Sequence, residues 1–250
     1  MAAISAIIIT RNEAHNIAAC IDSLRCCDEV IVLDSGSTDA TCALAAQRGA
    51  RVAHTADWPG FGPQKNRALA LATRDWVLSI DADERLTPEL ADEIARTVAG
   101  APSFNAYAIP RLSRYCGQYM RHGDWNPDLV VRLFRRTQAR FSDDIVHETL
   151  CAEGPRGRLR GTLLHDSFRD LDEVLDKLNA YSRAGALKMH ARGRRGGVGR
   201  AVLHGAWTFV RGYVLRLGWL DGRLGFVLAV SNAQGAYYRY LKLWLLQRAA

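Results

Sequence analysis

The 250-residue sequence contains no stretch of about 20 uncharged apolar residues, which a membrane-spanning helix requires. Its first residues, MAAISAIIITRNEAHN, include no basic segment, and the apolar run among them is too short for a secretory signal. There is also no internal repeat. Apolar residues make up 48% of the chain and charged residues 24%, so we expect a globular protein with a sizeable core.

Cysteine is present, but not in a pattern that indicates disulfides or a metal finger. No two cysteines form a CxxC pair, and none has zinc-finger spacing. We therefore expect a reducing, cytoplasmic environment in which they act as small apolar side chains. The six are Cys20, Cys26, Cys27, Cys42, Cys116 and Cys151.

Two phosphate-binding motifs are missing, GxxxxGK[ST] and GxGxxG, which argues against an ATPase and against a dehydrogenase. A nucleotidyltransferase usually carries a glycine-rich loop after its first strand, where this chain has TRNEAHN. No motif for binding RNA or DNA is present, so we expect no nucleic-acid partner.

Negative charge is scarce at one end of the chain. From Arg183 onward there are 12 Lys and Arg residues and one acid, Asp221, whereas the preceding part has 21 basic and 25 acidic residues. This basic segment is rich in Trp, Tyr, Phe and Leu at roughly helical spacing. The pattern favours an interfacial helix on an anionic membrane surface, although packing of a helical subdomain remains the alternative.

The first hundred residues alternate between apolar runs and short helical patterns. Such alternation predicts βαβ units and a parallel sheet. Strands are expected at residues 4–10, 29–34, 51–54 and 76–80, and helices at 16–24, 41–47, 65–72 and from Thr87 onward, with Thr87 as N-cap and Pro88 in the first turn.

The pattern changes after Gly100. We expect strands at 105–110, 129–134 and 159–164, a functional loop at 113–125 and a helix at 171–190. A basic linker at 192–199 then leads to amphipathic helices over 201–246, broken at Gly218, Gly222 and Gly235. The expected division is a catalytic domain at 1–190, with halves 1–100 and 101–190, and a helical tail at 191–250.

Acidic residues follow three of the expected parallel strands, where open sheets bind their ligands. Glu13 follows the first strand, Asp34 ends the second, and Asp81 and Asp83 follow the fourth, WVLSI. A phosphate ligand would be repelled from such an edge unless a cation were present. Because Mg²⁺ and Mn²⁺ prefer carboxylates together with phosphates, the sequence predicts a divalent metal at Asp81 and Asp83.

Three segments in order, IITRNEAHNI, DSGSTDAT and IDADERL, resemble the family 2 glycosyltransferases of the GT-A fold. The resemblance implies an α/β sheet flanked by helices, a nucleotide-sugar donor and a metal held by Asp81 and Asp83. It also implies that a further set of residues lines the nucleotide site. These are Thr10, Asn12, Glu13 and Asp34, with Ser37 and Asp39 beside them, although capping of the next helix explains the last two equally well.

The segments GFGPQKNRAL, LVVRLFRR, IVHETL and LLHDSFRDLDEVLDKLNAYSRAGA extend the resemblance to bacterial lipopolysaccharide core β-glucosyltransferases. It implies that Lys65 and Arg67 approach the donor, unless they lie on a helix surface, and that Arg132 pairs with the diphosphate. His165 is a further candidate metal ligand, or a structural histidine. For the general base the candidates are Glu148, favoured by the family pattern, and Asp144 or Asp143.

The expected function is inverting, metal-dependent transfer of a hexose, with glucose from UDP-glucose expected as donor, to a saccharide of the lipopolysaccharide core or a similar surface glycan. Transfer to a polyprenyl phosphate is the alternative that differs only in its acceptor. The basic tail would place the enzyme peripherally on the inner face of the cell membrane, beside a lipid-linked or glycan acceptor. An oligomer is compatible with the sequence.

Overall fold

The computed structural model describes residues 3–142 and 149–249. The chain forms two compact units, each made of two segments. Unit 1 comprises Met1–Arg111 and Asp128–His165, and unit 2 comprises Leu112–Pro127 and Asp166–Ala250. Two strands, β6 (Ala106–Tyr115) and β12 (Leu163–Phe168), begin in unit 1 and end in unit 2. The division differs from the boundary expected at residue 190, because the helix that precedes this residue packs with the C-terminal helices.

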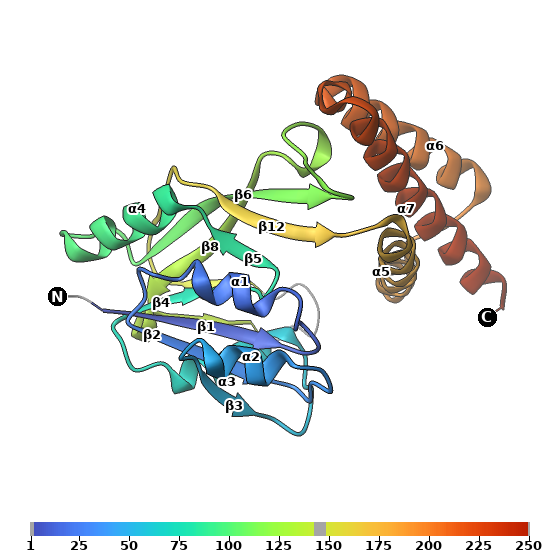
Figure 1. The fold of residues 1–250 in the computed structure, drawn as a ribbon. Coiled ribbons are helices and arrows are strands. Elements are labelled where there is room, and N and C mark those ends of the chain that lie inside the picture. Colours follow the sequence, from blue (N-terminus) through green and yellow to red (C-terminus); the bar gives the residue numbers. More distant parts are fainter. Residues whose placement is uncertain (1–2, 143–148, 250) are drawn as a thin grey trace. The chain divides into compact units, whose positions relative to one another are not determined.

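Unit 1 is built on a mixed sheet (Figure 1). Its first half is parallel. Strand β1 (Ile4–Thr10) lies between β2 (Glu29–Asp34) and β4 (Trp76–Ser79), and β3 (Arg51–His54) pairs with β2 at the edge of the sheet. Strand β4 pairs antiparallel with β8 (Asp128–Arg135), and β8 with β6. The order β3-β2-β1-β4-β8-β6-β12 ends at β5 (Glu84–Leu86), which pairs antiparallel with β12.

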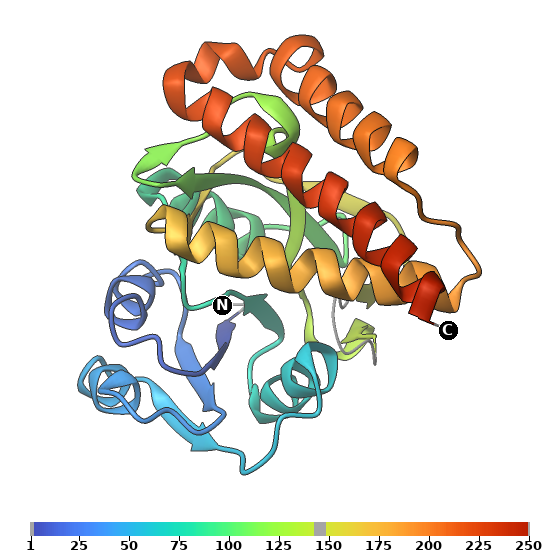
Figure 2. The same ribbon diagram turned by 90° about the vertical axis from the view of Figure 1, so that its right-hand side faces the viewer.

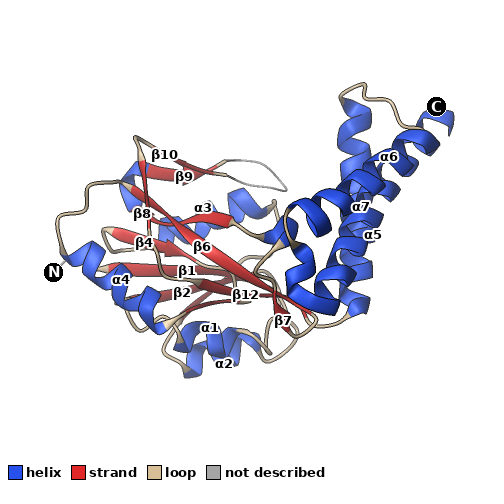
Figure 3. Cartoon of the chain, turned by 90° about the horizontal axis from the view of Figure 1, so that it is seen from above, coloured by secondary structure: helices blue, strands red, loops and turns tan. Residues whose placement is uncertain are grey.

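Helices cover both faces of the parallel half because its strands are apolar on both sides. On β1, Ile4 and Ile8 pack with α1 (Ile17–Asp22), α2 (Thr41–Gln47) and α4 (Pro88–Ala99). Ile7 points the other way, towards α3 (Phe61–Leu71). In Figure 3, α3 lies on one side of β1, β2 and β4, with α1 and α2 on the other. The β-branched run of the sequence therefore becomes a strand buried on both faces.

Smaller elements complete unit 1. They are the antiparallel pair β9 (Ala139–Phe141) and β10 (Leu150–Ala152), the short strand β11 (Arg156–Arg158) beside β6, and a 3₁₀ turn at Arg136–Gln138. The expected strand at 159–164 is displaced, since β12 begins only at Leu163. A Cβ at Gly161 would lie 2.6 Å from the Leu90 Cα, so the chain before β12 passes close to the start of α4 as an irregular segment.

Helix α3 begins earlier than its sequence suggests. The expected start was near Lys65, because Pro59, Gly60 and Gly62 indicate a turn, but the helix starts at Phe61. A proline is tolerated in the first turn, where backbone N–H groups have no partner within the helix. The early start adds one turn to the helix that carries Lys65.

Unit 2 contains three long helices, α5 (Leu171–Ala191), α6 (Val198–Phe209) and α7 (Gly222–Ala249). A π-helical turn, η3 (Val210–Leu215), and a 3₁₀ turn, η4 (Gly218–Asp221), connect α6 to α7. Figure 2 shows α7 in red running between α5 in gold and α6 in orange, and α7 contacts both. The segment 112–127 adds the end of β6, strand β7 (Gln118–Tyr119) and the 3₁₀ turn η1 (Gly123–Trp125).

Gly235 does not break a helix as expected but lies inside α7. Small residues instead allow α6 and α7 to approach each other closely. A Cβ at Gly205 of α6 would lie 3.3 Å from the Ala233 carbonyl oxygen of α7. Within the ranges that the structure describes, no helix is both long and apolar enough to cross a bilayer.

The start of α4 provides a test of the local sequence signals. The Thr87 hydroxyl accepts a hydrogen bond from the Leu90 amide at 3.3 Å, with Pro88 in the first turn. We predict that Thr87→Ala lowers the free energy of unfolding in urea by about 1 kcal/mol, because a helix amide loses its partner. Thr97→Ala, the same change inside the same helix, should leave stability unchanged or slightly raised. Equal losses in both variants would contradict a capping role.

Candidate active site

The carboxyl ends of the first three strands lie in register. Thr10 of β1 is paired with Asp34 of β2, and Asp34 with His54 of β3. The Thr10 hydroxyl is buried and has no hydrogen-bond partner among the described residues. A row of polar side chains thus follows the buried strands, as expected for the ligand-binding edge of an open sheet.

The loop after β1 is bound by several hydrogen bonds to the segment that follows β2. The Asn12 amide donates to the Ser37 hydroxyl at 2.8 Å, and the Asn12 side-chain oxygen accepts from the Thr38 amide at 2.8 Å. The Glu13 amide donates to the Thr41 hydroxyl, also at 2.8 Å. Asn12 has a left-handed backbone, with φ 58°. The predicted residues Asn12, Glu13 and Ser37 therefore belong to one cross-linked pair of loops.

Asp34 is almost completely buried at the centre of this arrangement. Its carboxylate accepts hydrogen bonds from the Gly36 amide at 3.0 Å, from the Ser37 amide at 2.9 Å and from the Ser37 hydroxyl. Burial acts to raise the pKa of Asp34, but the bonds from Ser37 and Gly36 outweigh it and hold the pKa below its ordinary value. Asp34 is thus a fixed, ionised acceptor.

Asp39 is bonded to the first turn of α2, as one sequence interpretation allowed, and also to the segment after β1. The N-cap position is Ala40, but the Asp39 carboxylate still accepts a hydrogen bond from the Thr41 amide in the first turn of α2, at 3.0 Å, and a second one from the Ala14 amide at 3.1 Å. Ser37 serves the loops and not the helix. Both side chains hold the segment between β2 and α2 against the segment after β1.

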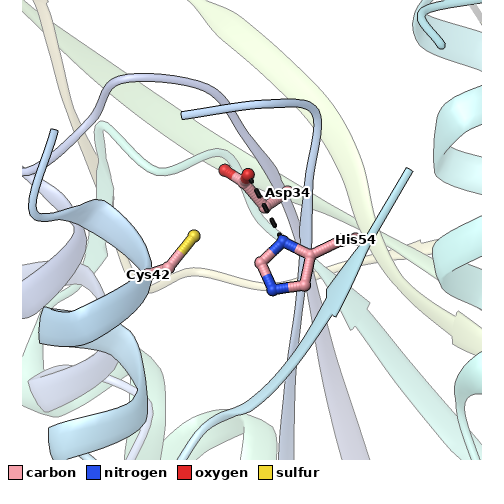
Figure 4. Close-up of side chains that lie close together, drawn as sticks. All are labelled: Asp34, Cys42 and His54. Carbon is pink, nitrogen blue, oxygen red and sulfur yellow. Dashed lines mark ion pairs between the residues drawn. The ribbon is translucent and has the colours of Figure 1, made fainter. Parts of the chain in front are cut away.

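Asp34 also lies beside Cys42 and His54 (Figure 4). Across the described ranges these are the single group of three or more His, Cys or acidic side chains whose ligand atoms all lie within 4.8 Å of one another. His54 Nδ1 is 3.6 Å from Asp34 Oδ2. Burial, followed by the charge of Asp34, raises the pKa of the Cys42 thiol above its ordinary value.

Asp81 follows β4 and is bound by two cations. The Lys65 ammonium lies 3.1 Å from Asp81 Oδ1, and the Arg132 guanidinium binds Asp81 Oδ2. Lys65 and Arg132 are buried, whereas the Asp81 side chain is one-third exposed. Burial acts to raise the pKa of Asp81, but the charges of Arg132 and Lys65 hold it far below its ordinary value. The aspartate is therefore permanently ionised at neutral pH.

Glu84 extends this ion-pair network into the core. Its fully buried carboxylate accepts hydrogen bonds from Arg132 at 2.6 Å and from Arg111 at 3.2 Å. The Asp81 amide donates to the same carboxylate at 3.0 Å. Arg111 in turn binds Asp128 at 2.8 Å. Each buried charge is thus matched by an opposite one, which is what the cost of burying charge demands.

The ion-pair network, Lys65, Arg111, Arg132, Asp81, Glu84 and Asp128, contains equal numbers of cations and acids. This result corrects the expectation of an uncompensated acidic edge that repels phosphate. The cations come from α3, β6 and β8, which are distant in sequence from Asp81. Sequence reasoning gave no role to Glu84 and Arg111, although Glu84 stands in the DADE run that signals the site.

Asp83 lies beside the network and close to His165. The two side chains are 3.4 Å apart, between Asp83 Oδ2 and His165 Nε2, and both are mostly buried. Pairing of β12 with β5 brings them together, since His165 is in register with Glu84. A carboxylate and an imidazole therefore converge from segments 82 residues apart in the chain.

The remaining predicted residues are placed differently. Arg67 forms an exposed pair with Asp57, at 2.7 and 3.0 Å, on the surface of α3, as the helix-surface interpretation allowed. Glu148, Asp144 and Asp143 lie outside the described residues.

The ion pairs of Asp81 generate a pH-dependent prediction. Because its pKa is lower in the folded than in the unfolded chain, Asp81 stabilises the fold above the ordinary carboxyl pKa and loses this effect as the pH falls. We predict that Asp81→Asn lowers the unfolding free energy by about 2 kcal/mol at neutral pH. The difference should shrink below about pH 4.

Urea unfolding of both proteins across this pH range checks the prediction, with Asp57→Asn as control. Asp57 also pairs with an arginine but is fully exposed, so its substitution should change stability little at any pH. A deficit of Asp81→Asn that stays constant down to pH 2 would contradict the assigned role.

The chain is similar in sequence to known glycosyltransferases. Residues 5–152 match the model of the family "Glycosyl transferase family 2". The chain is 32% identical to a glycosyltransferase of Rickettsia typhi, covering 97% of this chain and 87% of that protein. It is 31% identical to the lipopolysaccharide core biosynthesis glycosyltransferase LpsC of Rhizobium meliloti, covering 96% and 92%.

Among solved structures, the chain resembles glucosyl-3-phosphoglycerate synthase from Mycobacterium tuberculosis in complex with Mn²⁺, UDP and glucosyl-3-phosphoglycerate. That match has 31% identity and a TM-score of 0.38, and it covers 45% of this chain and 44% of that one. The family model spans more than half of the chain, and the two relatives named above match nearly all of it. The protein is a member of glycosyltransferase family 2, with the mixed, helix-flanked sheet of the GT-A fold.

Proposed function

We propose that this enzyme transfers glucose, with inversion, from UDP-glucose to a saccharide of the lipopolysaccharide core or a similar surface glycan. The observation that carries the proposal is the convergence of Asp83 and His165 beside a charge-balanced network at the carboxyl edge of the sheet. Similarity to LpsC over nearly the whole length supports a saccharide acceptor rather than a polyprenyl phosphate, which would use the same donor site.

The nucleotide part of the donor fits the cross-linked loops after β1 and β2. There, Asp34 is a fixed, ionised acceptor for a base or ribose donor group, and Thr10 offers a buried hydroxyl that no described residue satisfies. Because Asn12, Glu13 and Ser37 are already bonded across the two loops, the site is organised before a ligand binds. Such preorganisation favours recognition of one base, for which we propose uracil.

A divalent metal ion, Mg²⁺ or Mn²⁺, fits Asp83 and His165. A carboxylate and an imidazole are suitable ligands, and the remaining positions suit diphosphate oxygens and water. Such an ion, when bound, would stabilise the negative charge that develops on the departing diphosphate. Asp81 was expected to share the ion, but its oxygens already hold Lys65 and Arg132, so we assign it the positioning of these cations.

Lys65 and Arg132 are placed to meet the diphosphate. Both are buried and held by Asp81, so little side-chain freedom is lost when an oxyanion approaches them. The Nε of Arg132 is buried without a hydrogen-bond partner among the described residues, which leaves one donor of that guanidinium available. Arg67 is bound by Asp57 and is a weaker candidate for donor contact.

Transfer also requires removal of a proton from the acceptor hydroxyl. We propose Glu148 as the general base, with Asp144 as the alternative, on the strength of the family resemblance of IVHETL. The hydroxyl oxygen then attacks the anomeric carbon as its proton passes to the carboxylate. The bond between this carbon and the diphosphate oxygen breaks on the opposite face, which inverts the configuration.

The metal assignment is tested with Asp83→Ala. We expect transfer and hydrolysis of UDP-glucose with Mn²⁺ to fall at least about 100-fold, because the ion loses one of two protein ligands. Asp92→Ala, which removes an exposed acid of α4, is the control and should retain activity. The wild type should lose activity in EDTA and should prefer UDP-glucose to GDP- and dTDP-sugars. Retention of full activity by Asp83→Ala would refute the metal site.

The base assignment is tested with Glu148→Gln. This change keeps the size and hydrogen-bonding capacity of the side chain but removes its basicity, so kcat should fall about 100-fold or more with donor affinity unchanged. UDP binding measured by calorimetry supplies the control. If Asp144→Asn loses turnover while Glu148→Gln keeps it, Asp144 is the base.

A further inference from the structure

One face of α6 and η3 is apolar and exposed to solvent. Leu203, Trp207, Val210 and Val214 follow one another at helical spacing and are 71%, 54%, 41% and 50% exposed. The opposite face, with Ala201, Gly205 and Gly212, is buried. Packing within unit 2 therefore uses the small residues of these elements and leaves the large ones, here called the apolar stripe, in water.

The apolar stripe continues into the turn that leads to α7. Five further large apolar side chains are between 45% and 59% exposed there, namely Leu215, Leu217, Trp219, Leu220 and Phe226. The stripe itself spans 12 residues, 203–214, or roughly 16 Å along a helix. A contiguous exposed patch of this size is unfavourable in water and marks a surface that binds something.

The charges around the stripe have one sign. Residues 192–249 contain ten Lys and Arg residues, including Arg200, Arg216 and Arg223, which are exposed. The single acid, Asp221, is buried and bound to the His122 ring at 2.8 Å and to its backbone amide at 2.9 Å. A second acid, Asp124, pairs with Arg211 at 2.8 Å and with Arg216 at 3.2 Å, and its side chain is 9% exposed. The surface therefore combines exposed cations and apolar groups, and both nearby carboxylates are largely buried.

We propose that the apolar stripe inserts into the headgroup region of an anionic bilayer, with α6 parallel to the membrane plane. Aliphatic and Trp side chains would enter the acyl boundary while the neighbouring arginines meet lipid phosphates. Near an anionic leaflet several basic residues act together, so modest insertion suffices for binding. The docking stands independently of catalysis, whereas its use in reaching a lipid-linked acceptor rests on the proposed function.

Other occupants fit these observations less well. A second copy of the chain, docked by the same face about a two-fold axis, would bring arginines against arginines without an acid between them. A nucleic acid would leave the aliphatic stripe facing a polar, charged backbone. An anionic bilayer matches both the apolar and the cationic parts of the surface.

The test measures cosedimentation of the full chain with vesicles of phosphatidylcholine, alone or mixed with phosphatidylglycerol. We expect binding only with the mixed vesicles and weaker binding at high salt. Leu203→Glu combined with Trp207→Glu should weaken the association at least about tenfold, because two inserting side chains are lost and two like charges are added. The matched control is Leu187→Glu, an exposed leucine of α5, which should bind as the wild type does.

Circular dichroism should show that all variants are folded, and Asp83→Ala should bind vesicles normally, so failure of the metal assignment leaves this result intact. Absence of binding to both vesicle types would overturn the proposal. Equal weakening by Leu187→Glu would do the same, because the effect would not be specific to the stripe. Dimers in sedimentation velocity that the double variant dissociates, without vesicle binding, would identify a second copy as the occupant.

Discussion

The catalytic unit depends on the buried pairing of Arg132 with Asp81 and Glu84. A fully buried carboxylate such as Glu84 is tolerable only when cations and hydrogen-bond donors surround it, and Arg132, Arg111 and the Asp81 amide meet this requirement. These contacts join the loop after β4 to β6 and β8. The parallel half of the sheet is thereby held to its antiparallel half at the point where the donor would bind.

The same pairing determines what the neighbouring residues can do. With Asp81 occupied by Lys65 and Arg132, Asp83 and His165 form a separate acid–imidazole pair beside a balanced set of charges. If a carboxylate of the network moved away from its partner, a buried cation would be left without an opposite charge. The cost of removing that cation from water would then no longer be offset. In the function proposed above, structural and ligand-binding roles are divided between two aspartates that stand two residues apart in the sequence.

The sequence was a good guide where local physics determines the outcome. Continuous β-branched runs marked β1 and β2, and Thr87-Pro88 marked the start of α4, because burial and capping act over a few residues. It was a poor guide where distant segments meet. Nothing near Asp81 indicates that Arg132 arrives from β8, and Gly161 gave no sign that Leu90 would displace the start of β12. The pairing of Asp83 with His165 likewise arises only from strand topology.

The discontinuity of unit 2 has a consequence for synthesis of the chain. Tyr115 and Met120 pack against Val174 and Leu228, and the Tyr115 hydroxyl lies 2.9 Å from that of Ser231, 116 residues later. These side chains leave the ribosome long before their partners do. Unit 1 can close its sheet once His165 has emerged, whereas the apolar surface of segment 112–127 is only partly covered by Phe168 and Val174 until α7 is made. The partners of this segment are thus among the last residues of the chain to be made.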